Sequence, residues 1–518
     1  MTLVRPPTLQ AKWGHCTPTC PPLGLAYVAA ALREAGHEVR IIDAVGEAVS
    51  QMRPAANERL LVHGLGADEI AARVHPDTEV LGVSCMFSHE WPLMREVIAR
   101  LRRAFPGVPI VAGGEHVTAL PEFSLESCAG LDYCVLGEGE ETMVELARAL
   151  DEGRVSLAVP GLALRHGGQT VRTPARARIR RIDDIPPPAW DLVPLERYLD
   201  NELGFGVNRG RSIPLLATRG CPYQCTFCSN PVMWTTRWVA RDPGAVIEEM
   251  RGYVARYRAE NFDFYDLTAI VKREWIVDFC RRMLDGGLSV TWQLPSGTRS
   301  EAIDAEVARL LYAAGCRNIS YAPESGSAGV LRRIKKKIDL GRMKASMRAA
   351  VRTGINVKAN IILGFPDETH KEVLESMRFI VAMALLGVHD ISISPFSPYP
   401  GSELFEDMRR RGRLAALDDR YFYSLASYTD LFHTVSAAEG IGDRALGWYR
   451  TAGLLLFYAV SFVARPWRFV RTCINAFRPR QESRSEMWVR ETVFRLTHAR
   501  GAGAPSRGAR VDAGAAAP

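Results

Sequence analysis

The sequence predicts an α/β protein of two units, a doubly wound parallel sheet followed by a partial (β/α)6 barrel. Short β-rich runs alternate with helical stretches through residues 1–160 and again from about residue 211, the pattern of parallel strands joined by helical crossovers. Three successive prolines, Pro186 to Pro188, separate the two alternations, because proline continues neither a helix nor a central strand. The 518 residues suffice for two or three domains.

The first unit, residues 1–160, begins with a strand at 2–5 and a helix at 23–35 that ends at Gly36. Further strands are expected at 38–42, 79–84, 108–112 and 133–136, and further helices at 91–105 and 140–151. Doubly wound sheets bind ligands at the carboxyl ends of their strands. The turns Gly113-Gly114 and Gly137-Glu138-Gly139 follow two of these strands and are therefore candidate ligand-binding loops.

A connector over residues 161–204, with a small hairpin around Gly167, leads to the barrel at 205–411. Six barrel strands are expected near 214–218, 262–266, 289–294, 318–321, 356–363 and 390–394. Helices are expected between them at 243–257, 273–284, 304–313, 341–352 and 371–386. Residues 412–500 are predicted to be mostly helical, and 501–518, rich in Gly, Ala and Pro, to be disordered. Catalytic groups of such a barrel gather at the carboxyl ends of its strands.

Composition sets limits on the class of protein. The chain is 47% apolar and 24% charged, as ordinary globular proteins are. Eleven cysteines without a secretory leader favour a reducing, cytoplasmic compartment. The longest strongly apolar run, 452–464, is expected to be too short to span a bilayer.

Three cysteines, Cys221, Cys225 and Cys228, lie in the run TRGCPYQCTFCSN after the first barrel strand. Four thiolates would complete a [4Fe–4S] cluster, so three leave one iron free to bind a small molecule. The alternative of a zinc site lacks a second cysteine pair or a nearby histidine. With Phe227 before the third cysteine, the run resembles the signature of radical S-adenosylmethionine (SAM) enzymes. In that family the open iron binds the amino and carboxylate groups of SAM.

Other segments at barrel strand ends strengthen this resemblance, which covers about residues 205–410. Glu324 and Ser325 match the family's SAM-holding motif, and Arg299 and Asp266 are implied as further SAM contacts. The planar fork of arginine suits a carboxylate, although a structural salt bridge is an alternative for Arg299 and for Asp266. The family often has two successive aspartates where this chain has only Asp266.

Three segments of the first unit resemble the Rossmann-like cobalamin-binding domain that precedes many radical SAM enzymes: PPLGLAYVAAALREAGHEV, GGEHVTALPE and LDYCVLGEGEETMVEL. The resemblance implies cofactor contacts from Gly113, Gly114, Gly137, Glu138 and Gly139, since glycine lets a bulky ligand approach the backbone. His116 is expected to bond locally or to the cofactor tail.

The sequence offers no clear histidine ligand for cobalt. The Asp-x-His-x-x-Gly motif of base-off methyltransferases is not matched, because Leu61 replaces its aspartate, and His63 is therefore interpreted as a non-ligand. The lower cobalt face is expected to be open or covered by the loop that contains Ser84 and Met86. An empty, degenerate cobalamin fold is the alternative.

The resemblance implies an enzyme with three cofactors, a [4Fe–4S] cluster, SAM and cobalamin. Reductive cleavage of SAM would give a 5′-deoxyadenosyl radical that abstracts hydrogen from an unactivated carbon, which then receives a methyl group from methylcobalamin. A radical oxidative cyclase, like the anaerobic cyclase of chlorophyll synthesis, is the alternative, and the run Arg465-Pro466-Trp467-Arg468 resembles that family. A non-catalytic electron-transfer protein is a third candidate. The expected partners are a small-molecule substrate and a reducing flavodoxin or ferredoxin.

The positive charge is concentrated near the C-terminus. Nine arginines but three glutamates lie within 465–500, against a net charge of +7 for the chain. This excess is typical of a solvated helical face, or of a patch for an anionic membrane or an acidic substrate. No groove-reading motif accompanies it, which argues against nucleic acid. The aromatic region from Gly447 is expected to cap the barrel mouth or to dock at a membrane interface. Among the remaining cysteines, Cys16 and Cys20 are the least settled.

Overall fold

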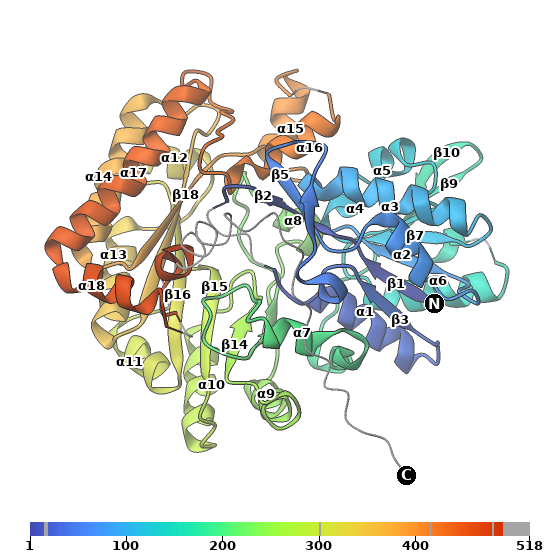
Figure 1. The fold of residues 1–518 in the computed structure, drawn as a ribbon, viewed down its shortest axis with the longest axis horizontal. Helices are drawn as coiled ribbons and strands as arrows, with labels where there is room; N and C mark the ends of the chain where they lie inside the picture. Colours follow the sequence, from blue (N-terminus) through green and yellow to red (C-terminus); the bar gives the residue numbers. More distant parts are fainter. Residues whose placement is uncertain (15–18, 155, 300–301, 415, 479–480, 490–518) are drawn as a thin grey trace, which may run out of the picture.

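The computed structural model describes residues 1–489 except 15–18, 155, 300–301, 415 and 479–480. It contains two large sheets that lie side by side, each flanked by helices (Figure 1). The predicted fold class, a doubly wound α/β unit followed by a six-stranded partial barrel and a helical C-terminal region, is confirmed.

The first sheet has the strand order β10-β9-β8-β7-β6-β1-β3. Its parallel part consists of β1 (Thr2–Arg5), β3 (Arg40–Asp43), β6 (Leu81–Ser84), β7 (Ile110–Gly113) and β8 (Tyr133–Val135). The flanking helices include α1 (Leu23–Glu34), α3 (Trp91–Ala104) and α6 (Glu140–Asp151). Because β1 lies between β3 and β6, the chain winds outward in both directions from β1, as predicted.

The hairpin of the predicted connector belongs to this sheet. Strand β9 (Leu162–His166) pairs antiparallel with β8, and β10 (Gln169–Arg172) pairs with β9. The sheet therefore extends past the expected boundary at residue 160. A second, small sheet of β2 (Thr8–Ala11), β4 (Met52–Pro54) and β5 (Leu60–His63) was not predicted.

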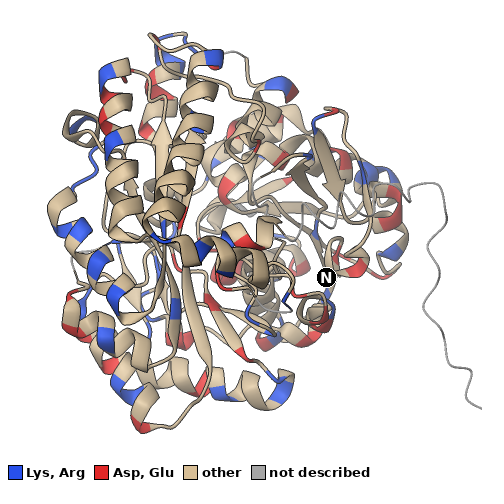
Figure 2. Cartoon of the chain, turned by 60° about the vertical axis from the view of Figure 1, so that its left-hand side comes forward, with Lys and Arg blue, Asp and Glu red and all other residues tan. Residues whose placement is uncertain are grey.

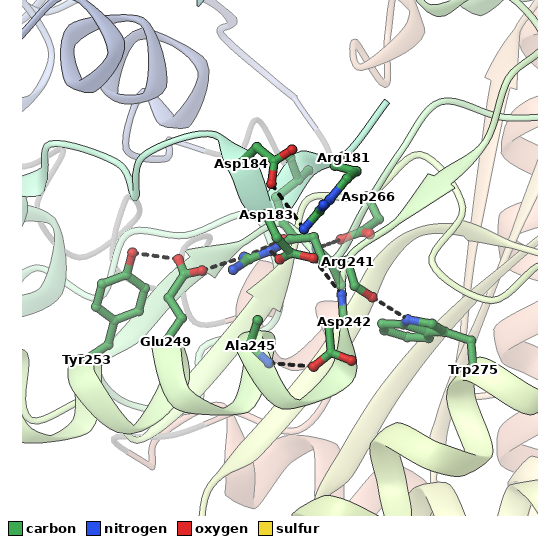
Figure 3. Close-up of polar contacts among 12 residues, drawn as sticks. Arg181, Asp183, Asp184, Arg241, Asp242, Ala245, Glu249, Tyr253, Asp266 and Trp275 are labelled. Atoms are coloured by element: carbon green, nitrogen blue, oxygen red, sulfur yellow. Dashed lines mark hydrogen bonds and ion pairs between the residues drawn. The ribbon is translucent and has the colours of Figure 1, made fainter. Parts of the chain in front are cut away.

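The rest of the connector is fixed to the barrel by Asp183. Its carboxylate accepts hydrogen bonds from Arg241 Nε at 2.8 Å and from the Asp242 backbone N–H at 2.7 Å (Figure 3). Arg241 also pairs with Glu249 of α9 (Pro243–Tyr257). Asp242 in turn caps α9 by accepting from the backbone N–H of Ala245. The segment is thus held against the barrel.

The barrel sheet is open and entirely parallel. Its order is β11 (Ser212–Leu215), β14 (Asn261–Phe264), β15 (Thr291–Thr298), β16 (Cys316–Glu324), β17 (Asn356–Leu363) and β18 (Asp390–Pro395). The covering helices beside α9 are α10 (Arg273–Asp285), α11 (Ala305–Ala313), α13 (Leu340–Thr353) and α14 (His370–Leu386). Helix α14 begins with a capping box in which Thr369 and Glu372 bond each other's backbone N–H groups.

The C-terminal helices are α15 (Glu403–Arg410), α16 (Asp419–Leu425), α17 (Asp443–Ala464) and α18 (Pro466–Asn475). Helix α16 packs Tyr421 and Phe422 into the core of the first unit. Helix α17 packs along α14 and the edge strand β18, so it forms a side wall rather than the expected cap over the barrel mouth (Figure 1). It buries its apolar face best there, because β18 has no strand beyond it.

Within the described residues, α17 is the single helix long and apolar enough to cross a membrane by length and composition. It is longer than the run expected from sequence, because its helix begins at Asp443.

Candidate active site

The three cysteines lie on one loop that follows β11 and the short β12 (Thr218–Arg219). All three cysteines are half-buried residues, and the Cys228 N–H donates to the Cys225 carbonyl at 3.1 Å. Burial raises the pKa of Cys228 to about 12, so this side chain becomes a thiolate ligand only when a metal cation replaces its proton.

In the described part of the chain no three His, Cys, Asp or Glu side chains are grouped as one metal ion would require. Tetrahedral zinc needs such a group, whereas an iron–sulfur cube takes each thiolate on a different iron. The spacing of the three cysteines, rather than this absence, is what favours the cluster.

Two basic side chains lie beside this loop. The Arg299 guanidinium is 3.4 Å from the centre of the Tyr223 ring and donates to the Lys337 carbonyl. Lys336 is largely buried and pairs with Glu324 at 2.9 Å. The Thr226 N–H donates to the Ile334 carbonyl at 3.1 Å, which fixes the basic segment to the cysteine loop. Arg299, the residue after β15, and Glu324, the last residue of the adjacent strand β16, therefore lie next to the thiols.

Asp266 and Ser325 have their bonding groups engaged within the fold. Asp266 accepts from Thr218 Oγ1 at 2.5 Å and from the Ala217 N–H at 3.3 Å, and burial raises the pKa of its carboxyl to about 6. Figure 3 shows it beside the barrel end of the connector. The Ser325 hydroxyl lies 3.1 Å from that of Ser376 on α14. Asp266 thus holds the strand that leads into the cysteine loop, and Ser325 holds α14.

A cavity of about 310 Å³ opens at the carboxyl ends of β1, β6, β7 and β8. This volume is within the range of small-molecule sites. Among its lining residues are most of those predicted from sequence: Ser84, Met86, Gly113, Gly114, Gly137, Glu138 and Gly139. The wall is largely apolar, with Leu3, Leu25 and Val28 among its members.

The glycines of this wall leave room that a side chain would fill. A Cβ on Gly113 would find its nearest neighbour 3.8 Å away, and one on Gly24 would meet nothing within 4 Å. Such a cradle suits a ligand lying against bare backbone. The residues present therefore fit the nucleotide tail of a cobalamin.

His116 is not among the residues that line this cavity. Its ring stacks on Trp91 at 4.4 Å and its Nδ1 lies 3.0 Å from Ser88 Oγ. Burial lowers the pKa of His116 to about 3, which keeps the ring neutral. The local bond expected for His116 is present. His63, the last residue of β5, is likewise buried, and its Nε2 lies 2.8 Å from the Val49 carbonyl oxygen.

The cavity and the cysteine loop share a set of buried contacts that sequence reasoning missed. Arg219, two residues before Cys221, donates to Glu140 at 2.6 Å and to Glu138 at 3.2 Å. Glu138 also pairs with Arg178 of the connector at 2.7 Å. The only sign of these contacts in the sequence was that Arg219 lies beside the cysteine run, and that Glu138 and Glu140 lie in and beside the glycine turn.

One further contact involves the cysteine loop, and another joins the first unit to the segment after β18. Ser229, the residue after Cys228, donates to Glu115, the residue after Gly114. The Ser88 N–H donates to the Tyr399 hydroxyl at 2.8 Å. Cys20 and Tyr265, the residue after β14, both line the cavity, whereas Cys16 lies outside the described residues.

An open (β/α) barrel with a three-cysteine loop, joined to a doubly wound domain with a glycine-lined cavity, defines the class of protein. Residues 14–147 match the family described as "B12 binding domain", and residues 215–380 match the "Radical SAM superfamily". The chain therefore belongs to the family of radical SAM enzymes that carry an N-terminal B12-binding domain.

Curated relatives include both methyltransferases and cyclases. The chain is 30% identical over 439 residues to "Uncharacterized methyltransferase PH0819" of Pyrococcus horikoshii, covering 84% of this chain and 88% of that protein. It is 29% identical over 397 residues to the "Anaerobic magnesium-protoporphyrin IX monomethyl ester cyclase" of Cereibacter sphaeroides, covering 75% of this chain and 60% of the cyclase.

Among solved structures, the methyltransferase TsrM from Kitasatospora setae, with cobalamin and a [4Fe–4S] cluster bound, superposes with a TM-score of 0.66. The identity is 19%, and the match covers 97% of this chain and 99% of that chain. This likeness shows a shared fold. SAM and cobalamin, two of the three expected cofactors, are those of the two matched domains.

Proposed function

We propose that this enzyme is a C-methyltransferase that acts on a small molecule held between the cysteine loop and the cobalamin cavity. The observation that carries the proposal is the direct contact of these two parts through the Arg219–Glu140 and Ser229–Glu115 bonds. A carbon activated at the cluster can reach a methyl donor only if the two sites are adjacent. The relative of Pyrococcus horikoshii, described as a methyltransferase, supports this reaction.

In this proposal Cys221, Cys225 and Cys228 hold the cluster, and the glycine turns around Gly113 and Gly137 hold the cobalamin tail. When bound, the cluster and SAM supply a carbon radical and methylcobalamin supplies the methyl group. The protein's own contribution is binding, orientation and exclusion of water. Arg299, held on the Tyr223 ring, is well placed to bind the SAM carboxylate with its fork.

Glu324 and Lys336 form a buried ion pair next to Cys225. We propose that Glu324 accepts from the SAM amino group while its contact with Lys336 holds the carboxylate in place. Asp266 and Ser325 act as positioning residues in this scheme, because their side chains are bonded to Thr218 and Ser376 rather than directed to a ligand. The loop with Ser84 and Met86 would cover the lower cobalt face.

A second candidate, a radical oxidative cyclase, is favoured by the 29% identity to the cyclase of Cereibacter sphaeroides. Product mass separates the two reactions, because methylation adds the mass of one CH₂ group and oxidative ring closure does not.

The test uses anaerobically reconstituted enzyme, a low-potential reductant, SAM and cobalamin. 5′-Deoxyadenosine formation that depends on all three cysteines, and S-adenosylhomocysteine formation that also depends on cobalamin, are the expected results. 5′-Deoxyadenosine without cobalamin-dependent S-adenosylhomocysteine would overturn methyl transfer and leave the cyclase. If the triple Cys→Ala variant kept both activities, both proposed reactions would be overturned.

We further propose a reducing flavodoxin or ferredoxin as electron donor and the cytoplasm as the compartment. The described cysteines are all free thiols, which supports a reducing compartment. The exposed Arg332 and Lys337 beside the cysteine loop would attract an acidic carrier.

A further inference from the structure

Large apolar side chains are exposed along the two helices that follow the barrel. Trp448 and Val463 of α17 are 75% and 84% exposed, and Phe477, just after α18, is 75% exposed. The whole set, here called the α17–α18 face, comprises Trp448, Leu455, Leu456, Val463, Trp467, Phe469, Val470, Ile474 and Phe477. A contiguous exposed apolar patch of this extent marks an interaction surface on a soluble protein.

Helix α17 has two apolar faces rather than one. Leu446, Gly453 and Phe457 are buried toward α14 and β18. The opposite face, with Trp448 and Leu455, has no charged residue, because Arg450 is the single charge within 445–464 and is buried. A surface helix of a soluble protein normally has polar residues on that outer face.

Helix α18 is fixed in place by its own arginines. Arg465 Nη2 donates to the Leu385 carbonyl at 2.9 Å, and Arg468 Nη2 donates to the Gly387 carbonyl at 2.8 Å, both at the C-terminal end of α14. These cations satisfy carbonyl groups that a helix end leaves free. The exposed Trp467 and Phe469 therefore belong to an anchored helix that is unable to turn them inward.

We propose that the α17–α18 face docks on the surface of an anionic lipid membrane, with both helices in the plane of the interface. This inference goes beyond the proposed function and does not rest on it. Besides the buried Arg450, residues 443–478 contain five arginines and one aspartate, and a basic helix with exposed Trp, Phe and Leu has the composition of an interfacial anchor. Figure 2 brings this side of the molecule toward the viewer.

A spanning orientation of α17 is excluded by Arg450. Its guanidinium donates to the Ile393 carbonyl at 3.2 Å and to Thr434 Oγ1 at 2.6 Å. Extraction of the helix into a bilayer would break these bonds and place the charge in hydrocarbon, which is unfavourable. The helix therefore lies on the membrane while its inner face stays packed on the barrel.

The positive charge at the ends of the α17–α18 face favours an anionic lipid surface over a second copy of the chain as its occupant. Exposed Arg444 and Arg478 lie near the two ends of the face. Face-to-face contact between two copies would bring these like charges together, which is unfavourable. Anionic headgroups would neutralise these charges, which favours binding to the membrane surface.

The experiment is flotation of the full-length holoenzyme with phosphatidylcholine vesicles and with vesicles of phosphatidylcholine and phosphatidylglycerol. We expect flotation with the anionic vesicles, and binding about tenfold or more weaker for the variant Leu455→Glu/Val463→Glu. Leu284→Glu, at an exposed leucine of α10, is the matched control and should float like the wild type. Unchanged cobalamin and iron content would show that the variants fold.

Absence of flotation with anionic vesicles would overturn the proposal, as would equal flotation of the double variant and the wild type. A dimer seen by light scattering without vesicles, and abolished by the same double variant, would assign the face to a second copy instead.

Discussion

Arg219, two residues before Cys221, donates to Glu140 at the start of α6 at 2.6 Å, and both side chains are more than nine-tenths buried. Glu140 and Arg219 both line the cavity at the carboxyl ends of β1, β6, β7 and β8. The aromatic rings of Tyr27 and Trp234 lie 5.1 Å and 5.8 Å from the guanidinium. One charged pair thus joins the wall of the cavity to the cysteine loop.

The variant Arg219→Met is expected to destabilise the protein and to weaken retention of cobalamin. Loss of one partner leaves buried carboxylates without their cation, at a cost of about 3–5 kcal/mol. Arg219→Met/Glu140→Gln should recover part of the loss, because the uncompensated charge is removed. Thermal unfolding and the absorbance of bound cobalamin measure both effects.

Arg33→Ala is the control for this pair, since Arg33 and Asp191 form a solvent-exposed ion pair that contributes less than about 1 kcal/mol. If the Arg219→Met protein were as stable as the Arg33→Ala protein, the buried ion pair would contribute nothing to the contact between the cavity wall and the cysteine loop.

Substitution at two adjacent glycines should separate cofactor binding from folding. At Gly113 a methyl group would meet nothing closer than 3.8 Å and would project into the cavity. Gly113→Ala should therefore fold normally and bind cobalamin at least tenfold more weakly. At Gly114 φ is +122° and a Cβ would lie 2.6 Å from the Cys85 carbonyl oxygen. Gly114→Ala should instead lower the melting temperature.

Cobalamin titration by absorbance and thermal unfolding of the apo-protein distinguish the two variants. Equal cobalamin affinity of Gly113→Ala and the wild type would mean that the tail does not lie against this backbone.

Replacement of any one cluster cysteine should abolish cluster assembly. Cys225→Ala leaves two thiolates, too few to hold a [4Fe–4S] cluster firmly. Iron and sulfide content and the visible absorbance band should fall several-fold, and SAM cleavage should stop. Cys473→Ala is the matched control, because Cys473 is exposed on α18. Full iron content in Cys225→Ala would remove this cysteine from the ligand set.

Much of the barrel could be predicted from sequence because its signals are local. The helix expected at 243–257 is found as α9 with the same ends, since Asp242 caps it and Pro243 begins it. The cysteine loop was likewise identified from spacing alone. Boundaries moved where pairing extends a strand, as for β16, which continues to Glu324.

Other features could not be predicted, and several of them depend on contacts between residues that are distant in the sequence. Glu138 and Arg219 are 81 positions apart, and neither residue carries a local sign of the other. The same holds for Ser229, which donates to Glu115, and for Ser325 and Ser376, whose hydroxyl groups are hydrogen-bonded to each other. The small β2-β5-β4 sheet has strands of three or four residues, too short for alternation to be recognised.

Glu90 should make the stability of the fold decrease as pH rises. Burial raises the pKa of its carboxyl from 4.5 to about 7, so between these values the unfolded chain ionises while the folded protein keeps its proton. The free energy of unfolding therefore falls by at most about 3 kcal/mol between about pH 4.5 and about pH 7, and is level above that range.

The side chain of the variant Glu90→Gln can still accept from the Leu9 N–H, and the variant removes this decline. The variant should match the wild type near pH 4.5 and exceed its melting temperature at pH 8. Thermal unfolding across this range is the measurement, with exposed Glu79→Gln as control. Parallel pH profiles for Glu90→Gln and the wild type would contradict the shifted carboxyl.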